Sequence, residues 1–415
     1  MKKWLLLALL CASLAADPLS LAQLIDIGLK NNPETTKSWS AVKRAQAQIG
    51  VAQSDYYPAI GVQGKLTHGR DVKFVNGPEV VFTNYGADLA LSYVLFDFGE
   101  RKAGVAATRD ALSAAKWSSD FAIQKVMFQV SESYYEYLSA QEQLKTKKSS
   151  LQDAEGVRDA AEDLFKAGLK SERDQAVSRA TVAELQMDLA GARAASEIAY
   201  GKLLMALGLP MSEKIEVQIA GEPKKESVGD LVAAAEEKRA DVLAMKATLS
   251  EMHERVKKSR RGPRPKLKLM GQGGWMEYAK HRDRGYNYTA GVTLDIPLFK
   301  GFENTYLKRV ALADEEITAA ELKALQEAVA LEVLTYSSSV KAAEETLSWS
   351  DQFLEEATKS YDAALESYKA GLSSIFDLVQ TQRMLSDARM KKTQARTKWL
   401  VSLAELAFAT GSLEK

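Results

Sequence analysis

The sequence predicts an α+β membrane protein that combines long antiparallel helical hairpins with a small set of amphipathic β-strands. Three observations support this fold class: two long stretches without proline, four segments in which apolar and polar residues alternate, and an internal duplication. The composition of the 415 residues, 46% hydrophobic and 27% charged, is that of a folded protein. Basic and acidic residues balance at 55 each, so the overall charge gives no reason to expect nucleic acid as a partner.

The N-terminus has the features of a secretory signal peptide, which we assign to residues 1–15. Two lysines precede a short apolar run, and small residues occupy the cleavage site after Ala15. The apolar run is far shorter than the ~20 residues that a membrane-spanning helix needs. Lipid attachment at Cys11 is the alternative, although the preceding residue, Leu10, is larger than such a signal prefers. Without the signal peptide no cysteine remains, which excludes disulfides and thiolate metal sites.

An internal repeat divides the rest of the chain into two halves. Lys-Ala-Gly-Leu begins at Lys166 and again at Lys369, which is 203 positions later, and other matches recur at the same offset. The upstream match of Pro58 with Pro265 lies at an offset of 207, so a four-residue difference falls between the strands of the first half. These matches predict one structural unit that occurs twice, with a linker at residues 211–227.

Both repeats have the same order of predicted elements. The first repeat (16–210) contains two helices within 20–55, a β-hairpin at 56–96 and a long helical hairpin at 100–207 with its tip at 166–171. The second repeat (228–415) contains two helices within 228–259, a β-hairpin at 263–299 and a helical hairpin at 303–409 with its tip at 369–374. Proline at position 33 separates the first two helices, because proline and the residue before it disfavour helix.

The four predicted strands are about ten residues long and have one apolar and one polar face. In the strand that starts near Asn84, for example, Leu89 and Leu91 alternate with Asp88 and Ser92. This pattern is typical of a membrane β-barrel with a wet interior. Four strands cannot close a barrel, and open edges in lipid are costly, so several copies must build one barrel together. A soluble sheet packed on helices is the alternative that alternation alone leaves open.

The predicted helical hairpins are too long for a globular core. Residues 100–166 would run ~100 Å as one helix, and the return helix is predicted at 172–207. Many alanines and serines lie between the apolar positions, which favours close packing of neighbouring helices as in a coiled coil.

Each hairpin turn contains a glycine and a Ser-x-x-Asp motif. Gly168 and Gly371 are expected to end helices in the left-handed conformation. Ser171-x-x-Asp174 and Ser374-x-x-Asp377 are then expected to cap the return helices. Caps do not explain the adjacent leucines, Leu169 and Leu372, which a tight turn would leave exposed. Exposed leucines at a tip suggest a binding partner.

Other kinds of site find no support in the sequence. His68, His253 and His281 have no metal-ligand spacing, and no phosphate-binding loop, dinucleotide fingerprint or nucleophile elbow is present. We therefore expect no catalytic residues, no metal and no cofactor. The basic run at 257–266 comes just before a predicted strand and is interpreted as charge at a barrel mouth or on an equatorial surface, not as a nucleic-acid site.

Several of these segments resemble one family, the TolC-like outer-membrane efflux proteins of bacteria. Residues 19–34 (LSLAQLIDIGLKNNPE) are similar to the opening motif of that family, and 94–101 and 296–304 to its strand-to-helix junctions. The two KAGL turns are similar to its periplasmic helix turns. The resemblance covers nearly all of the chain after residue 15, in order and in duplicate.

The resemblance implies a homotrimer in which each chain contributes four strands to a 12-stranded outer-membrane β-barrel in contact with lipid. A hollow helical barrel continues into the periplasm, and an adaptor protein docks at its tips together with an inner-membrane pump. The adaptor-binding residues would be Gly168, Leu169, Ser171, Gly371, Leu372 and Ser374. Candidates for the closed aperture would be Asp174, Tyr368, Asp377 and Gln380. Some relatives have an arginine where this chain has Ser373, and an acid where it has Gln380, so the closing contacts are expected to differ.

The expected function is therefore a passive exit channel in the outer membrane of a tripartite efflux or type I secretion system. Two alternatives are a periplasmic helical scaffold and a general diffusion porin. The scaffold leaves the amphipathic strands unexplained, and the porin leaves the long helices unexplained.

Overall fold

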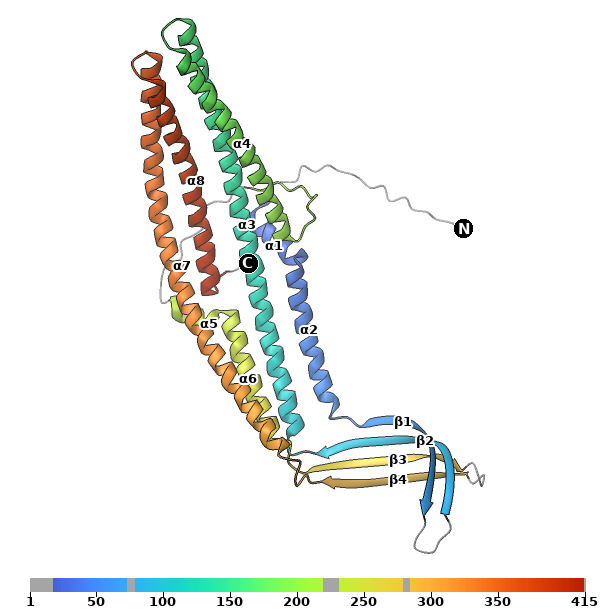
Figure 1. Ribbon diagram of the computed structural model, residues 1–415. Coiled ribbons are helices and arrows are strands. Elements are labelled where there is room, and N and C mark those ends of the chain that lie inside the picture. Colours follow the sequence, from blue (N-terminus) through green and yellow to red (C-terminus); the bar gives the residue numbers. More distant parts are fainter. Residues whose placement is uncertain (1–17, 73–78, 219–230, 279–283, 414–415) are drawn as a thin grey trace, which may run out of the picture. The chain divides into compact units, whose positions relative to one another are not determined.

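The computed structural model describes residues 18–72, 79–218, 231–278 and 284–413 (Figure 1). The predicted signal peptide, with Cys11, lies outside the described residues. The helices of the described part are α1 (Leu21–Asn31), α2 (Pro33–Ser54), α3 (Glu100–Lys166), α4 (Glu172–Leu207), α5 (Leu231–Lys238), α6 (Ala240–Arg261), α7 (Glu303–Lys369) and α8 (Ile375–Thr410). The strands are β1 (Ala59–Val72), β2 (Glu79–Phe96), β3 (Lys266–Tyr278) and β4 (Arg284–Asp295).

The predicted long helices are confirmed. Helices α3 and α7 each have 67 residues, and the return helices α4 and α8 each have 36. Both long helices end at a left-handed glycine, and both return helices start at a serine cap. None of the described helices is long and apolar enough to cross a membrane.

The chain forms two compact units, each of which takes elements from both repeats. Unit 1 comprises residues 1–37, 120–239 and 328–415, as far as they are described. Unit 2 comprises residues 38–119 and 240–327 and contains the whole sheet. The two repeats are therefore intertwined in each unit, and a cut at the predicted linker would divide both units.

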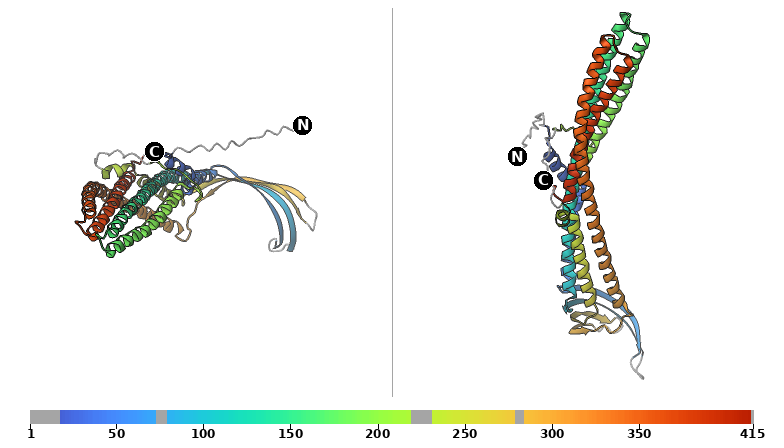
Figure 2. Two further views of the ribbon diagram at one scale, coloured as in Figure 1. Left: turned by 90° about the horizontal axis from the view of Figure 1, so that it is seen from above. Right: turned by 90° about the vertical axis from the view of Figure 1, so that its left-hand side faces the viewer.

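In unit 2 the four strands form one antiparallel sheet in the order β1-β2-β3-β4, which bends along its length (Figure 2). Strands β2 and β3, from different repeats, pair in the middle of the sheet. Cross-strand partners always share a face. Apolar partners include Val62 with Leu89 and Leu269 with Val292.

The predicted alternation of faces is confirmed, but the predicted strand length is wrong. The strands have 14, 18, 13 and 12 residues, where about ten were expected. In the first hairpin the hydrogen-bonded register continues to Val72 and Glu79, past the point where the apolar alternation fades. Backbone pairing extended these strands where side-chain patterning gave no signal.

The apolar face is uncovered. Val62 is 77% exposed and Tyr288 is 90% exposed, although both face away from the polar side of the sheet. On the polar face, by contrast, Asp88 is buried. Its carboxylate contacts Lys65 Nζ at 2.8 Å and accepts a hydrogen bond from Gln272 Nε2 at 2.9 Å. An apolar face open to the surroundings and a polar face with internal ion pairs fit lipid on one side and water on the other.

Both strand-to-helix junctions use two consecutive left-handed residues. These are Phe98 and Gly99 after β2, and Gly301 and Phe302 after β4. Asp97 secures the first junction, because its carboxylate accepts hydrogen bonds from the backbone N–H groups of Gly99 and Arg101. Burial opposes ionisation of Asp97, but these bonds and the Arg101 guanidinium lower its pKa overall.

In unit 1 helix α1 packs into a core formed with α3 and α4. Leu24 is fully buried there with Val130 and Leu203. Asn32, just after α1, donates from Nδ2 to the carbonyl of Ala206 at 2.9 Å, which ties α1 to the end of α4.

The start of the predicted linker is part of this core. Residues 211–218 are described, and Val217 forms a parallel bridge with Leu19. The hydroxyl of Tyr134 donates to the carbonyl of Gln218 at 2.6 Å. The first part of the predicted connection between the repeats, 211–218, thus packs on the core of unit 1, and its remainder from 219 lies outside the described residues.

Candidate functional site at the two helix turns

Two turns at one end of unit 1 connect α3 to α4 and α7 to α8 (Figure 1). Gly168 has φ +71° and Gly371 has φ +78°, so both adopt the predicted left-handed conformation. The amides of the following leucines donate 2.9 Å hydrogen bonds five residues back, from Leu169 to Leu164 and from Leu372 to Ser367. The last helical carbonyls are thus satisfied, as in a Schellman cap.

The predicted capping boxes are confirmed at both return helices. Ser171 Oγ accepts from the amide of Asp174, and the Asp174 carboxylate accepts from the amide of Ser171 at 3.1 Å. Ser374 and Asp377 repeat this arrangement. Each cap contributes about 1 kcal/mol to the stability of its helix start.

The predicted exposure of the two turn leucines is also confirmed. Leu169 is 68% exposed and Leu372 is 84% exposed. A leucine side chain that is fully buried gains ~1.5–3 kcal/mol relative to an exposed one. Covering these two leucine side chains with a binding partner would therefore be favourable.

Two cations of the first turn contact the second turn. Lys170 Nζ donates to the carbonyl oxygen of Ser373 at 2.9 Å and lies 5.0 Å from the centre of the Tyr368 ring. The guanidinium of Arg173 lies 4.8 Å from the centre of the Phe376 ring. A hydrogen bond from a charged donor contributes ~1.5–3 kcal/mol, and an exposed cation–π contact ~0.5–1 kcal/mol, so Lys170 forms the stronger link.

Neither contact was predicted from the sequence. Lys170 and Ser373 occupy equivalent positions in the two repeats, as do Arg173 and Phe376, because each pair is 203 residues apart. One feature of the sequence could have indicated them: at these equivalent positions the first turn has two cations, whereas the second has a serine and an aromatic ring.

The four gate candidates lie in different environments. Tyr368 is fully buried, and burial, followed by the charge of Asp174, raises the pKa of its phenol. Asp174 is half-buried, whereas Asp377 and Gln380 are exposed. Within the described part of the chain, the Tyr368 hydroxyl and the Ser373 hydroxyl are buried without a hydrogen-bond partner.

An apolar core supports the turns from inside unit 1. Tyr368 packs there with Ile375 and Leu378 of the second hairpin and with Val157 and Ala161 of the first. Residues from α3, α7 and α8 share this core, so the two hairpins are held together by side-chain packing as well as by the turn contacts.

Polar contacts continue along the helices away from the turns. Arg383 of α8 pairs with Glu184 of α4 at 2.7 Å, and Arg389 of α8 pairs with Asp153 of α3 at 2.7 Å. The first pair is largely exposed and contributes ~0–1 kcal/mol. The second is about three-quarters buried and is joined by Ser149 at 3.3 Å, so it is the firmer of the two.

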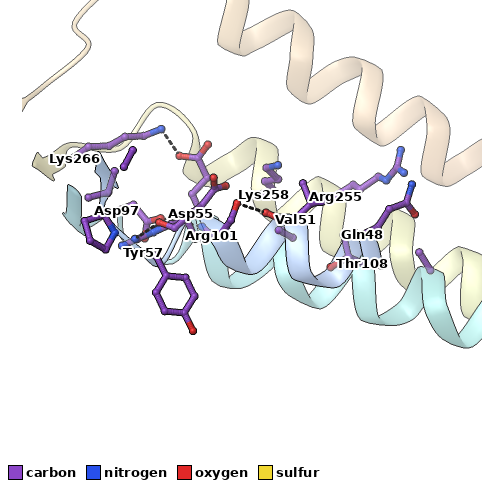
Figure 3. A pocket seen from close by; sticks show the side chains of 18 of the residues that line it. Gln48, Val51, Asp55, Tyr57, Asp97, Arg101, Thr108, Arg255, Lys258 and Lys266 are labelled. Carbon is purple, nitrogen blue, oxygen red and sulfur yellow. Dashed lines mark hydrogen bonds and ion pairs between the residues drawn. The ribbon is translucent and has the colours of Figure 1, made fainter. Parts of the chain in front are cut away.

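Unit 2 contains a cavity of about 980 Å³ where α2, α3 and α6 meet the sheet (Figure 3). Its charged side chains are largely paired: Lys266 with Glu100 at 2.6 Å, and Arg101 with Asp97 at 2.8 Å. The lining has no nucleophile next to a base. Two residues of the basic run 257–266, Lys258 and Lys266, line this cavity.

Metal sites have no candidate among the described residues, which contain no cluster of three or more His, Cys, Asp or Glu side chains that could hold an ion. His68 pairs with Thr83 in the sheet and His253 with Glu315 between helices. His281 lies outside the described residues.

Comparison with known proteins matches this architecture to one family. Residues 24–209 and 231–412 match the family model described as outer membrane efflux protein. Protein CyaE of Bordetella pertussis is 25% identical over 402 residues, which cover 94% of this chain and 84% of that protein. The pyoverdine export outer membrane protein OpmQ of Pseudomonas putida is 23% identical, with 94% and 85% covered. The crystal structure of the Campylobacter jejuni CmeC outer membrane channel has the same fold, with a TM-score of 0.83 at 17% identity over 94% of this chain and 85% of that one.

Proposed function

Because the chain belongs to the outer membrane efflux protein family, we propose that it is the passive exit channel of a tripartite efflux or type I secretion system. The family places it in the outer membrane with a periplasmic helical extension. The observation that carries the proposal is the four-stranded sheet, which has one lipid-compatible face, one polar face and two open edges.

A homotrimer satisfies these open edges. Three copies supply twelve strands, enough to close a barrel with a water-filled interior, whereas four strands are too few. The apolar side chains that the single chain exposes, such as Val62 and Tyr288, would then face lipid.

The two helix turns are proposed as the docking site of a periplasmic adaptor protein, which connects the channel to an inner-membrane pump. Leu169 and Leu372 offer exposed apolar contacts, and the rigid caps at Ser171 and Ser374 fix their positions. A pre-organised turn loses little conformational entropy on binding, which favours affinity.

The gate is proposed to lie next to this docking site. Asp174, Asp377 and Gln380 would line the aperture, and Tyr368 would anchor the second turn from inside the core. Lys170 and Arg173 would hold the two turns together in the closed state. An adaptor that binds the turn leucines competes with these contacts and so opens the aperture.

Membrane fractionation tests the channel proposal. We expect the protein without its signal peptide to remain with outer membranes through salt and carbonate washes, and to enter solution as a trimer only with detergent. A protein that is soluble and monomeric without detergent would contradict the proposal and favour a periplasmic scaffold.

Conductance separates a gated channel from a diffusion porin. In planar bilayers we expect small, rare openings from the trimer alone, because its periplasmic end is closed. Large permanently open channels would favour a porin.

A further inference from the structure

The two outer strands of the sheet each have an unused edge. Among the residues that the structure describes, strand β1 pairs with β2 alone, and β4 pairs with β3 alone. Every residue of β4 is exposed. Unpaired backbone N–H and C=O groups cost several kcal/mol each in lipid, so both edges require a partner strand.

The two hairpins of the sheet have the same register. In the first hairpin Ala59 lies opposite Ser92, and in the second Lys266 lies opposite Asp295. These positions are equivalent under the sequence offsets of 207 for β1 and β3 and 203 for β2 and β4. The pair Gln63 and Asp88 likewise corresponds to Met270 and Gly291. The duplication is therefore preserved in the hydrogen-bond register as well as in the sequence.

Strands β2 and β3 form the seam between the two repeats inside one chain. Each seam of this kind joins the second strand of one repeat to the first strand of the next. Where copies meet, the equivalent seam joins β4 of one copy to β1 of its neighbour. The observed β2–β3 register, in which Leu89 lies opposite Gly273, thus serves as a template for the contact between copies.

We propose that β4 pairs antiparallel with β1 of a second copy, with Val292 opposite Leu66 of that copy. The offsets convert Leu89 to Val292 and Gly273 to Leu66. The same conversion places Thr293 opposite Lys65 in the neighbouring chain. This register rests on the proposed function, which requires several copies to close one barrel.

The side chains provide an independent check of this register. The pairing places apolar Val292 with Leu66 on the lipid face, and polar Thr293 with Lys65 on the inner face. Shifting β4 by one residue would bring Lys65 to the face of Val292, where its charge would meet lipid. The face pattern therefore agrees with the register given by the repeat offsets and excludes a shift by one residue.

The two kinds of seam differ at one position. Asp88, buried between Lys65 and Gln272, secures the seam within the chain. Its equivalent at the seam between copies is Gly291, which has no side chain to form such contacts. The seam between copies therefore depends on backbone pairing and on the match of faces.

Disulfide cross-linking tests the proposed register. Directly opposite residues in an antiparallel pair have Cα atoms ~4.5–5.5 Å apart, within the range of a disulfide. We expect the double variant Val292→Cys with Leu66→Cys to form covalent trimers after oxidation in outer membranes. The slipped pairs, Val292→Cys with Gly64→Cys and with His68→Cys, place these atoms ~7–8 Å apart and should cross-link at least ten-fold less.

Two controls complete the experiment. The pair Leu89→Cys with Gly273→Cys sits at the template seam and should cross-link within one chain, leaving a monomer on denaturing gels. A Cβ at Gly273 meets only ordinary contacts, the nearest at 3.7 Å. Variants with only one of the two new cysteines measure any disulfide that forms with Cys11.

The outcomes separate this register from the channel proposal itself. Trimers that cross-link mainly through a slipped pair, or through none of the three pairs, overturn the register and leave the channel proposal standing. A chain that is monomeric and not held in membranes, while the template control still cross-links, overturns both. Covalent trimers from the Val292 and Leu66 pair alone support both.

Discussion

The two helix turns share their backbone and differ in their chemistry. Both have a left-handed glycine, a serine cap and an exposed leucine. At three equivalent positions, however, the first turn has Phe165, Lys170 and Arg173, whereas the second has Tyr368, Ser373 and Phe376. The duplicated turns thus share one backbone conformation. They differ in side chains: the first turn supplies two cations, and the second supplies the carbonyl and the aromatic ring that these cations contact.

The comparison separates what the turns have in common from what makes them unequal. The shared features, glycine, cap and leucine, are proposed to serve docking. The unequal features, the cations against the carbonyl and aromatic rings, are proposed to hold the closed state. Substitutions can test each set separately.

The largest effect is expected when both turn leucines are removed. Leu169→Asp combined with Leu372→Asp should reduce adaptor cross-linking and export to background, because charged side chains cannot replace the apolar contact. Both side chains are exposed, so the trimer should still form. Lys166→Asp with Lys369→Asp places the same charge near each glycine and keeps the leucines, and export by this control should stay close to normal. Unchanged export by the leucine variant would remove the docking assignment.

The next effect concerns the unequal contacts. Lys170→Ala should raise the open probability of the trimer in planar bilayers several-fold, and Arg173→Ala should do so less, because the hydrogen bond to Ser373 is the stronger link. Lys166→Ala is a matched control, since Lys166 pairs with Glu162 of its own helix and not with the second turn in the described part of the chain. An increase of equal size in all three variants would point to a general charge effect.

A smaller effect is expected at the glycines. Gly168→Ala and Gly371→Ala should each weaken the local turn by about 1 kcal/mol, because alanine is strained at positive φ. No neighbouring atom lies within 4 Å of the added methyl group, so the cost is conformational. Faster amide exchange at Leu169 and Leu372 would show it. Gly156→Ala and Gly191→Ala, in helices with equally open surroundings, should have the opposite sign.

The smallest effect should come from making the second turn resemble the first at Tyr368. Tyr368→Phe removes a buried hydroxyl that has no partner in the described chain, so thermal stability at neutral pH should be unchanged or slightly higher. Burial raises the pKa of the Tyr368 phenol, so the folded state ionises at higher pH than the unfolded state. Tyr368 therefore destabilises the fold as pH rises above its unfolded pKa of ~10, and the Phe variant should lose less stability between pH 9 and 11. An identical pH profile for both proteins would contradict this.

The helical part of the fold could be predicted closely because its signals are local. The absence of proline from 100–166 and the glycine at each turn define the helix limits, and Ser-x-x-Asp defines the next start. Exposure of Leu169 and Leu372 followed from the same local geometry.

Features that depend on distant contacts could not be predicted. Strand β1 extends to Val72 because its backbone pairs with Glu79, and no side-chain alternation marks that extension. Lys170 finds Ser373 only because two hairpins pack side by side through a shared core. One sequence without its fold does not show which equivalent positions meet in space.

The unequal length of the two β-hairpins has a consequence for the surface presented to the outside. Among the described residues, 79–83 of β2 pair with β1, whereas the β2–β3 pairing begins at Asn84, so the described pairing of the first hairpin extends about 17 Å further along the strand. In the proposed ring of three copies, long and short hairpins would alternate around the rim of the barrel. A large particle or antibody that approaches the cell would then contact the three long hairpins first, while the pore mouth would lie further in, between them.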